Sequence, residues 1–200
     1  MSNEPAGTAG SERVVLRVAL ALNALMFVVG LAAGLAAGSV GLIADSLDML
    51  ADALAYALSL AAIGRPKQFK ARLAGTSGVL LLVLGLGVGF EAIRRAFGFD
   101  QPDGTIMVAT ALLSLVVNVM VMRLLTRYRK GEVHLRAAWI FTRADVVANI
   151  AVILSAVIVW VSGSRFPDLI VGFAIAAYVI REAIEILREA RHSLRSAEAT

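Results

Sequence analysis

The sequence predicts an all-α membrane protein: a six-transmembrane-helix bundle with both termini in the cytoplasm. Of its 200 residues, 59% are hydrophobic and only 17% are charged, whereas soluble domains average about 45–50% and about 25%. The apolar residues form long runs, and Lys and Arg gather at alternate ends of those runs. There is no cysteine, which excludes disulfides, thiolate metal sites and thiol nucleophiles.

The first apolar stretch, from Arg17 to Asp45, is too long for one span, because about 20 residues cross the hydrocarbon core. We therefore expect a turn near Gly38. The six expected helices cover approximately residues 14–37, 40–63, 73–97, 105–128, 134–161 and 168–192. Residues 1–12 are expected to form a flexible polar tail without a signal peptide, residues 13–192 the membrane domain, and residues 193–200 a short tail.

Three glycines in the first expected helix and at its end are spaced so that they lie on one face. Gly30, Gly34 and Gly38 are spaced four residues apart. Small residues at this spacing let two membrane helices approach closely. We therefore expect a tight crossing on this face.

The basic residues indicate the orientation, because excess Lys and Arg mark the cytoplasmic side. One side receives both terminal segments and the connections between helices two and three and between helices four and five, with Arg65, Lys67, Lys70, Arg72, Arg127, Arg129 and Lys130 among their basic residues. The other side has only Arg94, Arg95 and Arg165. This pattern predicts a multi-pass protein of the cell inner (plasma) membrane. It also accounts for the net charge of +4 without a nucleic-acid partner.

Three aspartates fall inside the second expected helix. Asp45, Asp48 and Asp52 are spaced by three and four residues, so they lie on one helix face. A charged residue at the bilayer centre costs at least about 2.5–3.5 kcal/mol, and neighbouring like charges repel one another. Such a cluster requires a cation, protons or basic partners to neutralise it.

A fourth aspartate, Asp145, lies in the fifth expected helix. Counting about 1.5 Å per residue from opposite membrane faces places Asp52 roughly 18 Å deep and Asp145 roughly 16 Å deep. In a core about 30 Å thick, these depths differ by less than one helical turn. Asp48, Asp52 and Asp145 can therefore converge near the midplane. Asn149 lies one turn beyond Asp145 and is a further candidate ligand, as is Asp45.

Other polar residues have simpler interpretations. Arg143 is the one intramembrane base that could pair with the aspartates, although it can also reach the interface. Glu91 is expected to pair with Arg94 and Arg95. Two further pairs of residues could in principle bind a metal but have structural interpretations. The buried amides Asn23 and Asn118 are expected to hydrogen-bond neighbouring helices, and His134 and His192 are expected to be solvated at helix ends.

The run from Gly38 to Leu54, GSVGLIADSLDMLADAL, resembles the second helix of the cation diffusion facilitator family, which typically reads GSxALLADAx[HD]xxxD. The resemblance covers essentially residues 14–190. It continues at Arg65-Pro66, at Phe90-Glu91-Ala92-Ile93-Arg94-Arg95, at Val117-Asn118 and at Leu135-Arg136-Ala137-Ala138-Trp139.

The resemblance implies a secondary transporter that exports divalent transition-metal cations of the zinc, cobalt, iron, manganese or cadmium class, by proton antiport. It implies a metal site at Asp48, Asp52 and Asp145, with Phe141 where the family has a fourth ligand. The partners would be the metal ion as cargo, protons, the lipid bilayer and a second copy in a homodimer. No enzymatic activity and no cofactor are expected. The cytosolic domain that usually follows the sixth helix is expected to be absent.

Two alternatives remain open. A non-transporting metal-sensing or assembly subunit is favoured by the phenylalanine at a ligand position and by the expected absence of the cytosolic domain. A metal-dependent membrane phosphotransferase would share aspartates on helices, with the pattern DxxDGxxAR. Here Asp45-Ser46-Leu47-Asp48 is followed by Met49 in place of glycine, and no Ala-Arg pair or second aspartate pair follows.

Overall fold

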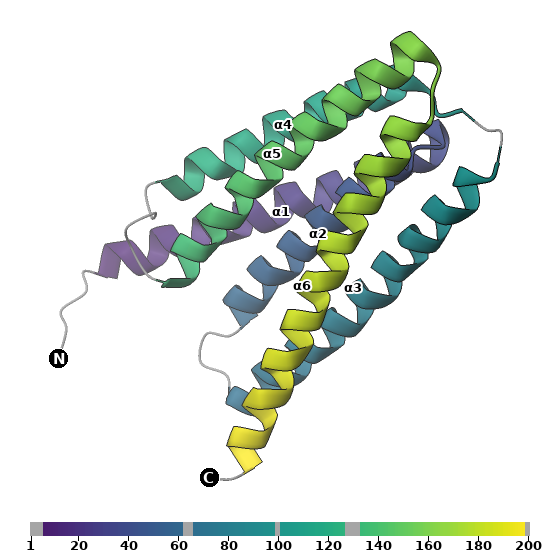
Figure 1. The fold of residues 1–200 in the computed structure, drawn as a ribbon. Coiled ribbons are helices and arrows are strands. Elements are labelled where there is room, and N and C mark those ends of the chain that lie inside the picture. The colour runs from purple at the N-terminus through teal and green to yellow at the C-terminus, as the bar shows by residue number, and fades with distance from the viewer. Residues whose placement is uncertain (1–5, 62–65, 99–100, 127–132, 199–200) are drawn as a thin grey trace.

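The protein is all-helical in the computed structural model, which describes residues 6–61, 66–98, 101–126 and 133–198 (Figure 1). Within those ranges there is no strand. The six helices are α1 (Ala6–Ala37), α2 (Val40–Ala61), α3 (Lys67–Ala96), α4 (Gly104–Thr126), α5 (Val133–Ser162) and α6 (Phe166–Glu198). The predicted helical class and the order of six helices are therefore confirmed.

Helix α2 is the centre of the bundle, because it contacts each of the other five helices. Around it, α1 packs on α4, α4 packs on α5, and α3 packs on α6. Figure 1 shows the α4–α5 pair and the α3–α6 pair close together at one end of the molecule and spread apart towards the other end. The helix that carries three aspartates thus lies between the two pairs.

A glycine turn joins α1 to α2. Gly38 has a φ of 64°, a conformation that glycine adopts without steric cost, and the amide of Ser39 donates to the carbonyl of Gly34 (2.9 Å). The hydroxyl of Ser39 then accepts a hydrogen bond from the amide of Leu42 (3.0 Å). Ser39 is therefore the N-cap of α2, and the expected turn at Gly38 is confirmed.

The glycine face of α1 packs against α2. A Cβ atom at Gly34 would lie only 2.8 Å from Cγ1 of Ile43 and 2.9 Å from its backbone nitrogen. A Cβ atom at Gly30 would lie 3.2 Å from Cβ of Ser46. The predicted close crossing is confirmed, and it brings α1 against the start of the aspartate-bearing helix.

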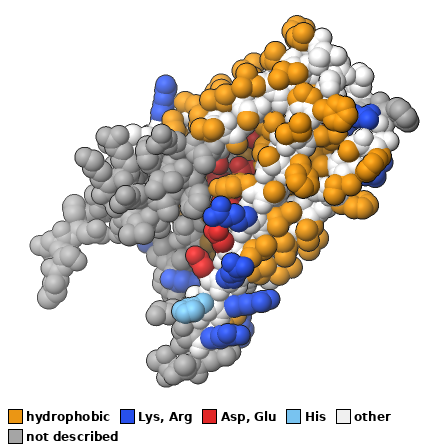
Figure 2. Space-filling model, viewed as in Figure 1, with side chains coloured by type: hydrophobic (Ala, Val, Ile, Leu, Met, Phe, Trp, Pro, Cys, Tyr) orange, Lys and Arg blue, Asp and Glu red, His pale blue; other side chains and the backbone are white. Residues whose placement is uncertain are grey.

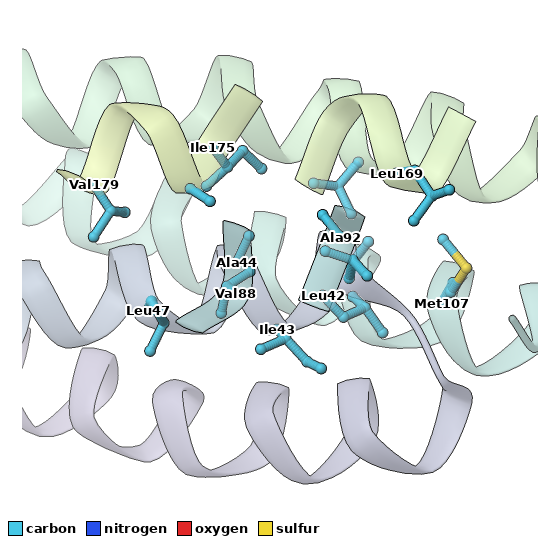
Figure 3. Packing of buried hydrophobic residues seen from close by; sticks show 14 of the residues in the cluster. Leu42, Ile43, Ala44, Leu47, Val88, Ala92, Met107, Leu169, Ile175 and Val179 are labelled. Atoms are coloured by element: carbon cyan, nitrogen blue, oxygen red, sulfur yellow. The ribbon is translucent and has the colours of Figure 1, made fainter. Parts of the chain in front are cut away.

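Buried aliphatic side chains fill the space between α2, α3 and α6. Leu42 and Leu47 of α2, Val88 of α3, and Ile175 and Val179 of α6 belong to one cluster (Figure 3). Burial of each such side chain contributes about 1.5–3 kcal/mol when the reference is water. This packing sets the position of α6 relative to α2, which matters for the site described below.

An extended apolar area covers much of the described part of the face shown in Figure 2. Large side chains project outward along several helices, including Phe90, Val116, Trp160 and Ile170, each at least 61% exposed. Such extended apolar surfaces need lipid or a partner to cover them. Four helical segments of the described chain are long and apolar enough to cross a membrane: Arg13–Ala37, Gln68–Ala96, Gly104–Thr126 and Asp145–Ser162. The other two helices are interrupted by charge, since α2 carries three aspartates and the second half of α6 is amphipathic.

Three helices are longer than expected. Helix α1 begins at Ala6 and not near residue 14, α3 begins at Lys67 and not at Leu73, and α6 continues to Glu198. Residues 6–12 are therefore helical, in place of the flexible tail expected there. Their polar composition does not prevent a helix, because a long helix that is already nucleated extends at little cost.

Candidate metal-binding site

The aspartates of α2 point into the bundle. Asp45 and Asp48 are 3% and 7% exposed, and Asp52 is half-buried. Their spacing places them on one helix face, and that face is directed at α4, α5 and α6. Burying an ionisable group inside a membrane bundle costs free energy, so such groups are usually paired or belong to a functional site. The surroundings of each carboxylate therefore indicate its role.

Asp145 of α5 meets two of these aspartates. Its carboxyl group lies within side-chain hydrogen-bonding reach of both Asp48 and Asp52. It is only 5% exposed, and its Oδ2 accepts no hydrogen bond from any donor in the described part of the chain. The convergence expected from the depth estimate is present, with three carboxyl groups contributed by two helices.

Asp45 has different surroundings from the other three. Its Oδ2 accepts a hydrogen bond from the Ser114 hydroxyl of α4 (3.2 Å), and its Oδ1 accepts one from Nδ2 of Asn149 in α5 (3.3 Å). Both oxygens are therefore engaged by neutral donors. Asp45 connects α2 to α4 and α5 and is less available to a cation than Asp48, Asp52 or Asp145.

Asn149 also bonds its own helix, because Nδ2 donates to the carbonyl of Asp145 (2.8 Å). The amide oxygen of Asn149 is buried and has no hydrogen-bond partner among the described residues. That oxygen remains available as a donor atom to a metal. Oδ1 of Asn23 and Oδ1 of Asn118 are also buried without a partner in that part of the chain, and Nδ2 of Asn23 bonds its own helix at Ala19.

No basic side chain of the described residues neutralises the aspartates. The ion pairs formed by the described side chains lie elsewhere, at Glu91–Arg94 (2.7 Å), Glu91–Arg95 (2.7 Å) and Arg181–Glu185 (3.0 Å). The predicted pairing of Glu91 is thereby confirmed. The side chains of Phe141, Arg143 and His134 lie outside the described residues, although the backbone there belongs to α5.

The carboxylates are adjacent but do not surround one point. Among the described side chains, no three Asp, Glu, His or Cys groups are placed so that they could hold a metal ion as they stand. The donor atoms that are present are carboxylate and amide oxygens, which suit hard and intermediate divalent cations.

Helix α6 adds two polar residues that sequence reasoning missed. The Tyr178 hydroxyl donates to Oε1 of Glu182 (2.7 Å), and the charge of Glu182 acts on Asp48, Asp52 and Asp145. The spacing of four residues places Tyr178 and Glu182 on the same face of the helix, which was the one indication of this pair in the sequence. The pair was overlooked because this part of α6 has the composition of an amphipathic helix that has left the membrane.

Cavities lie on two sides of the aspartates. One, of about 350 Å³, is bordered by Asp48, Asp145 and Tyr178 and is otherwise lined by aliphatic residues of α5 and α6. The other, of about 240 Å³, lies between α2 and α6 and is bordered by Asp52 and Glu182. The aspartates thus separate an apolar cavity from an acidic one.

These features define a class: a helical membrane protein with unneutralised carboxylates buried inside its bundle. Residues 16–195 match the model of the cation efflux transmembrane domain. The chain belongs to this family, the cation diffusion facilitators. It is a multi-pass protein of the inner (plasma) membrane, and the family consists of transporters and not of enzymes, which removes the phosphotransferase alternative.

Several curated proteins are similar to this chain. The metal cation efflux system protein CzcD of Cupriavidus metallidurans is 26% identical over 92% of this chain and 62% of its own length. The zinc transporter ZitB of Yersinia pseudotuberculosis is 26% identical over 90% of this chain and 62% of its own length. The cadmium, cobalt and zinc/H(+)-K(+) antiporter of Bacillus velezensis is 23% identical over 92% of this chain and 64% of its own length. The chain therefore spans less than two thirds of the length of these relatives.

Proposed function

We propose that this chain exports a divalent transition-metal cation from the cytoplasm, in exchange for protons, through a site formed by Asp48, Asp52 and Asp145. One observation carries the proposal: three carboxyl groups from two helices lie together inside an apolar bundle, with no Lys or Arg of the described residues beside them. A divalent cation supplies the missing positive charge.

The cargo we propose is a cation of the zinc, cobalt, iron, manganese or cadmium class. The names of the relatives support zinc, cadmium and cobalt. The all-oxygen donor set supports manganese, iron(II) or cobalt, because imidazole, which zinc favours, is absent from it. Asn149 would add its unpartnered amide oxygen as a further ligand.

Proton exchange follows from the same charge balance. Three carboxylates in contact in an apolar interior cannot all remain charged without a counter-cation. When the metal leaves, protons take its place. The name of the Bacillus velezensis relative, a cadmium, cobalt and zinc/H(+)-K(+) antiporter, supports an exchange for protons.

The proposal includes six membrane spans, residues 13–192 as the transport domain, both termini inside and a homodimer. Helix α2, with 22 residues, is roughly 33 Å long, which is enough to cross the bilayer.

The topology can be tested by cysteine labelling. Because the chain has no cysteine, single cysteines introduced at exposed positions report the side of the membrane on which they lie. Gln101→Cys should react with a membrane-impermeant maleimide in intact cells, and Gln68→Cys only after permeabilisation. The reverse pattern would overturn the orientation.

The decisive experiment is uptake of metal into proteoliposomes. Asp48→Ala, Asp52→Ala and Asp145→Ala should each abolish transport while the protein still inserts. Asp52→Asn is the sharpest variant, and Asp103→Asn is its matched control, because Asp103 is exposed and caps α4 outside the site. Wild-type transport by Asp52→Asn would refute the site.

The remaining alternative is a sensing or assembly subunit that binds metal without moving it. In that case, equilibrium binding would require the three aspartates, and wild-type proteoliposomes would show no flux above protein-free liposomes. The same preparation therefore separates the two functions.

A further inference from the structure

Glu182 is a carboxylate outside the ion pairs of the described residues, and the positive charge that acts on it is that of Arg181, which is paired with Glu185. It is half-buried on the face of α6 that looks towards α2, and within the described part of the chain it forms no ion pair. Its neighbour Glu185 is different, since it is exposed and paired with Arg181 (3.0 Å). Among the described residues, the hydrogen bond to Glu182 comes from the Tyr178 hydroxyl to Oε1 (2.7 Å). This bond orients the carboxylate and leaves Oε2 unengaged.

Glu182 and Asp52 border the same cavity. The cavity occupies about 240 Å³ between α2 and α6, and the small side chains of Ala51 and Ala55 leave room for it. One water molecule takes up about 30 Å³ in the liquid. A volume of this size accepts a divalent cation that keeps most of its hydration shell.

Asp52 connects this cavity to the buried aspartates. On one side it borders the cavity with Glu182, and on the other its carboxyl group reaches Asp145. Asp145 is 5% exposed, and its Oδ2 has no donor among the described residues. An unpartnered buried oxygen of this kind is costly, and it marks the direction in which a cation at Asp52 would be attracted.

A wider cavity adjoins the acidic one between the start of α3 and the C-terminal part of α6, and the side chains of Lys70 and His192 also line it. It measures about 500 Å³ and shares Ile186 and Glu189 with the smaller cavity. The carboxylates of Glu189, Glu182 and Asp52 therefore follow one another inward from the surface. Figure 2 shows acidic side chains exposed in this region, between the apolar surface and the basic side chains near the C-terminal end.

We propose that Glu182 and Asp52 form a second cation position, in which a partly hydrated divalent cation is held before or after it occupies the site at Asp48, Asp52 and Asp145. The inference rests on the proposed function. Asp52 belongs to both positions, so the cation moves between them by exchanging Glu182 for Asp145 while Asp52 stays bound. Glu182 thereby sets the concentration of metal at which the inner site fills.

The test compares Glu182→Gln with Glu185→Gln in the full chain. Both remove one negative charge from α6 beside the same cavity, but only Glu182 is unpaired. Zn²⁺ is the probe, in equilibrium binding in detergent and in proteoliposome uptake. Glu182→Gln should raise the half-saturating Zn²⁺ concentration about 10-fold or more, the size of effect seen when groups around a metal site are removed. Glu185→Gln should change it by less than about 2-fold.

A rescue variant separates charge from shape. Glu182→Asp keeps the carboxylate and should stay closer to the wild type than Glu182→Gln does, even though aspartate is smaller. If Glu182→Gln binds and transports Zn²⁺ like the wild type, or if both glutamine variants weaken binding equally, the second position is refuted.

That failure is distinguishable from failure of the proposed function. Loss of the function would appear as absent uptake by the wild type itself. The binding comparison between the two glutamine variants does not depend on uptake, so it reports on Glu182 in either case.

Discussion

Asp168 holds the start of α2, and its removal should destabilise the bundle. The side chain is 1% exposed and accepts three hydrogen bonds from the first residues of the α2 segment: from the Ser39 hydroxyl (2.5 Å), the Val40 amide (2.8 Å) and the Gly41 amide (3.0 Å). Asp168 itself lies at the start of α6. It therefore caps one helix from another and fixes their relative position.

The magnitude for Asp168→Ala follows from the groups left behind. The Ser39 hydroxyl can turn to another acceptor, but the Val40 and Gly41 amides are buried and would lose their partner. Each unsatisfied buried donor costs about 1–3 kcal/mol, so we expect a loss of about 2–6 kcal/mol. Asp103→Ala is the matched control, because Asp103 caps α4 where water can replace it, at a cost of about 0.5–2 kcal/mol.

The assay is unfolding of the full chain in mixed micelles by increasing SDS, followed by circular dichroism. Asp168→Asn should fall between the wild type and Asp168→Ala, because the amide keeps one acceptor oxygen. A free-energy loss for Asp168→Ala no larger than that of Asp103→Ala would show that the bonds across α2 and α6 do not stabilise the fold.

Three further predictions concern packing, metal preference and protons. Gly34→Ala should lose about 1–3 kcal/mol of stability through overpacking against Ile43, whereas Gly87→Ala, with no atom within 4 Å of the added Cβ, should be neutral or stabilising in the same unfolding assay. Phe141→His should shift competition flux from manganese towards zinc, and an unchanged ratio would show that position 141 does not face the metal. Metal binding measured by calorimetry in two buffers of different ionisation enthalpy should release protons at pH 7, and a release near zero would indicate uniport.

The position of Asp145 was predictable because it depended on two quantities that a sequence contains. Helical rise gives depth along each helix, and an aspartate's distance from the helix end gives its level in the membrane. Its neighbours Asp48 and Asp52 share a face by spacing alone. No knowledge of helix packing was needed to bring these three to the same level, and the structure places them together.

The partners of Asp45 and the position of Glu182 beside the aspartates were not predictable in this way. The hydrogen bonds of Asp45 to Ser114 and Asn149 depend on how α4 and α5 rotate about their axes, which packing decides. Glu182 lies beyond the apolar part of α6, from Leu169 to Ile180, so its sequence indicates a solvated face. It shares a cavity with Asp52 because α6 packs against α2, and the sequence of α6 alone does not contain that packing.

The cap that Asp168 makes on α2 has a mechanical consequence. It attaches α6 to α2 at one end, reinforced there by the close contact of Gly172 with Val40 and Gly41. Glu182 lies fourteen residues further along, roughly 21 Å from this attachment. A tilt of α6 by about 10° around the attached end would move Glu182 by roughly 4 Å, while the hydrogen bonds at Asp168 stay in place. A change in the tilt of α6 would therefore alter the width of the acidic cavity, although the attachment itself lies at the start of the helix.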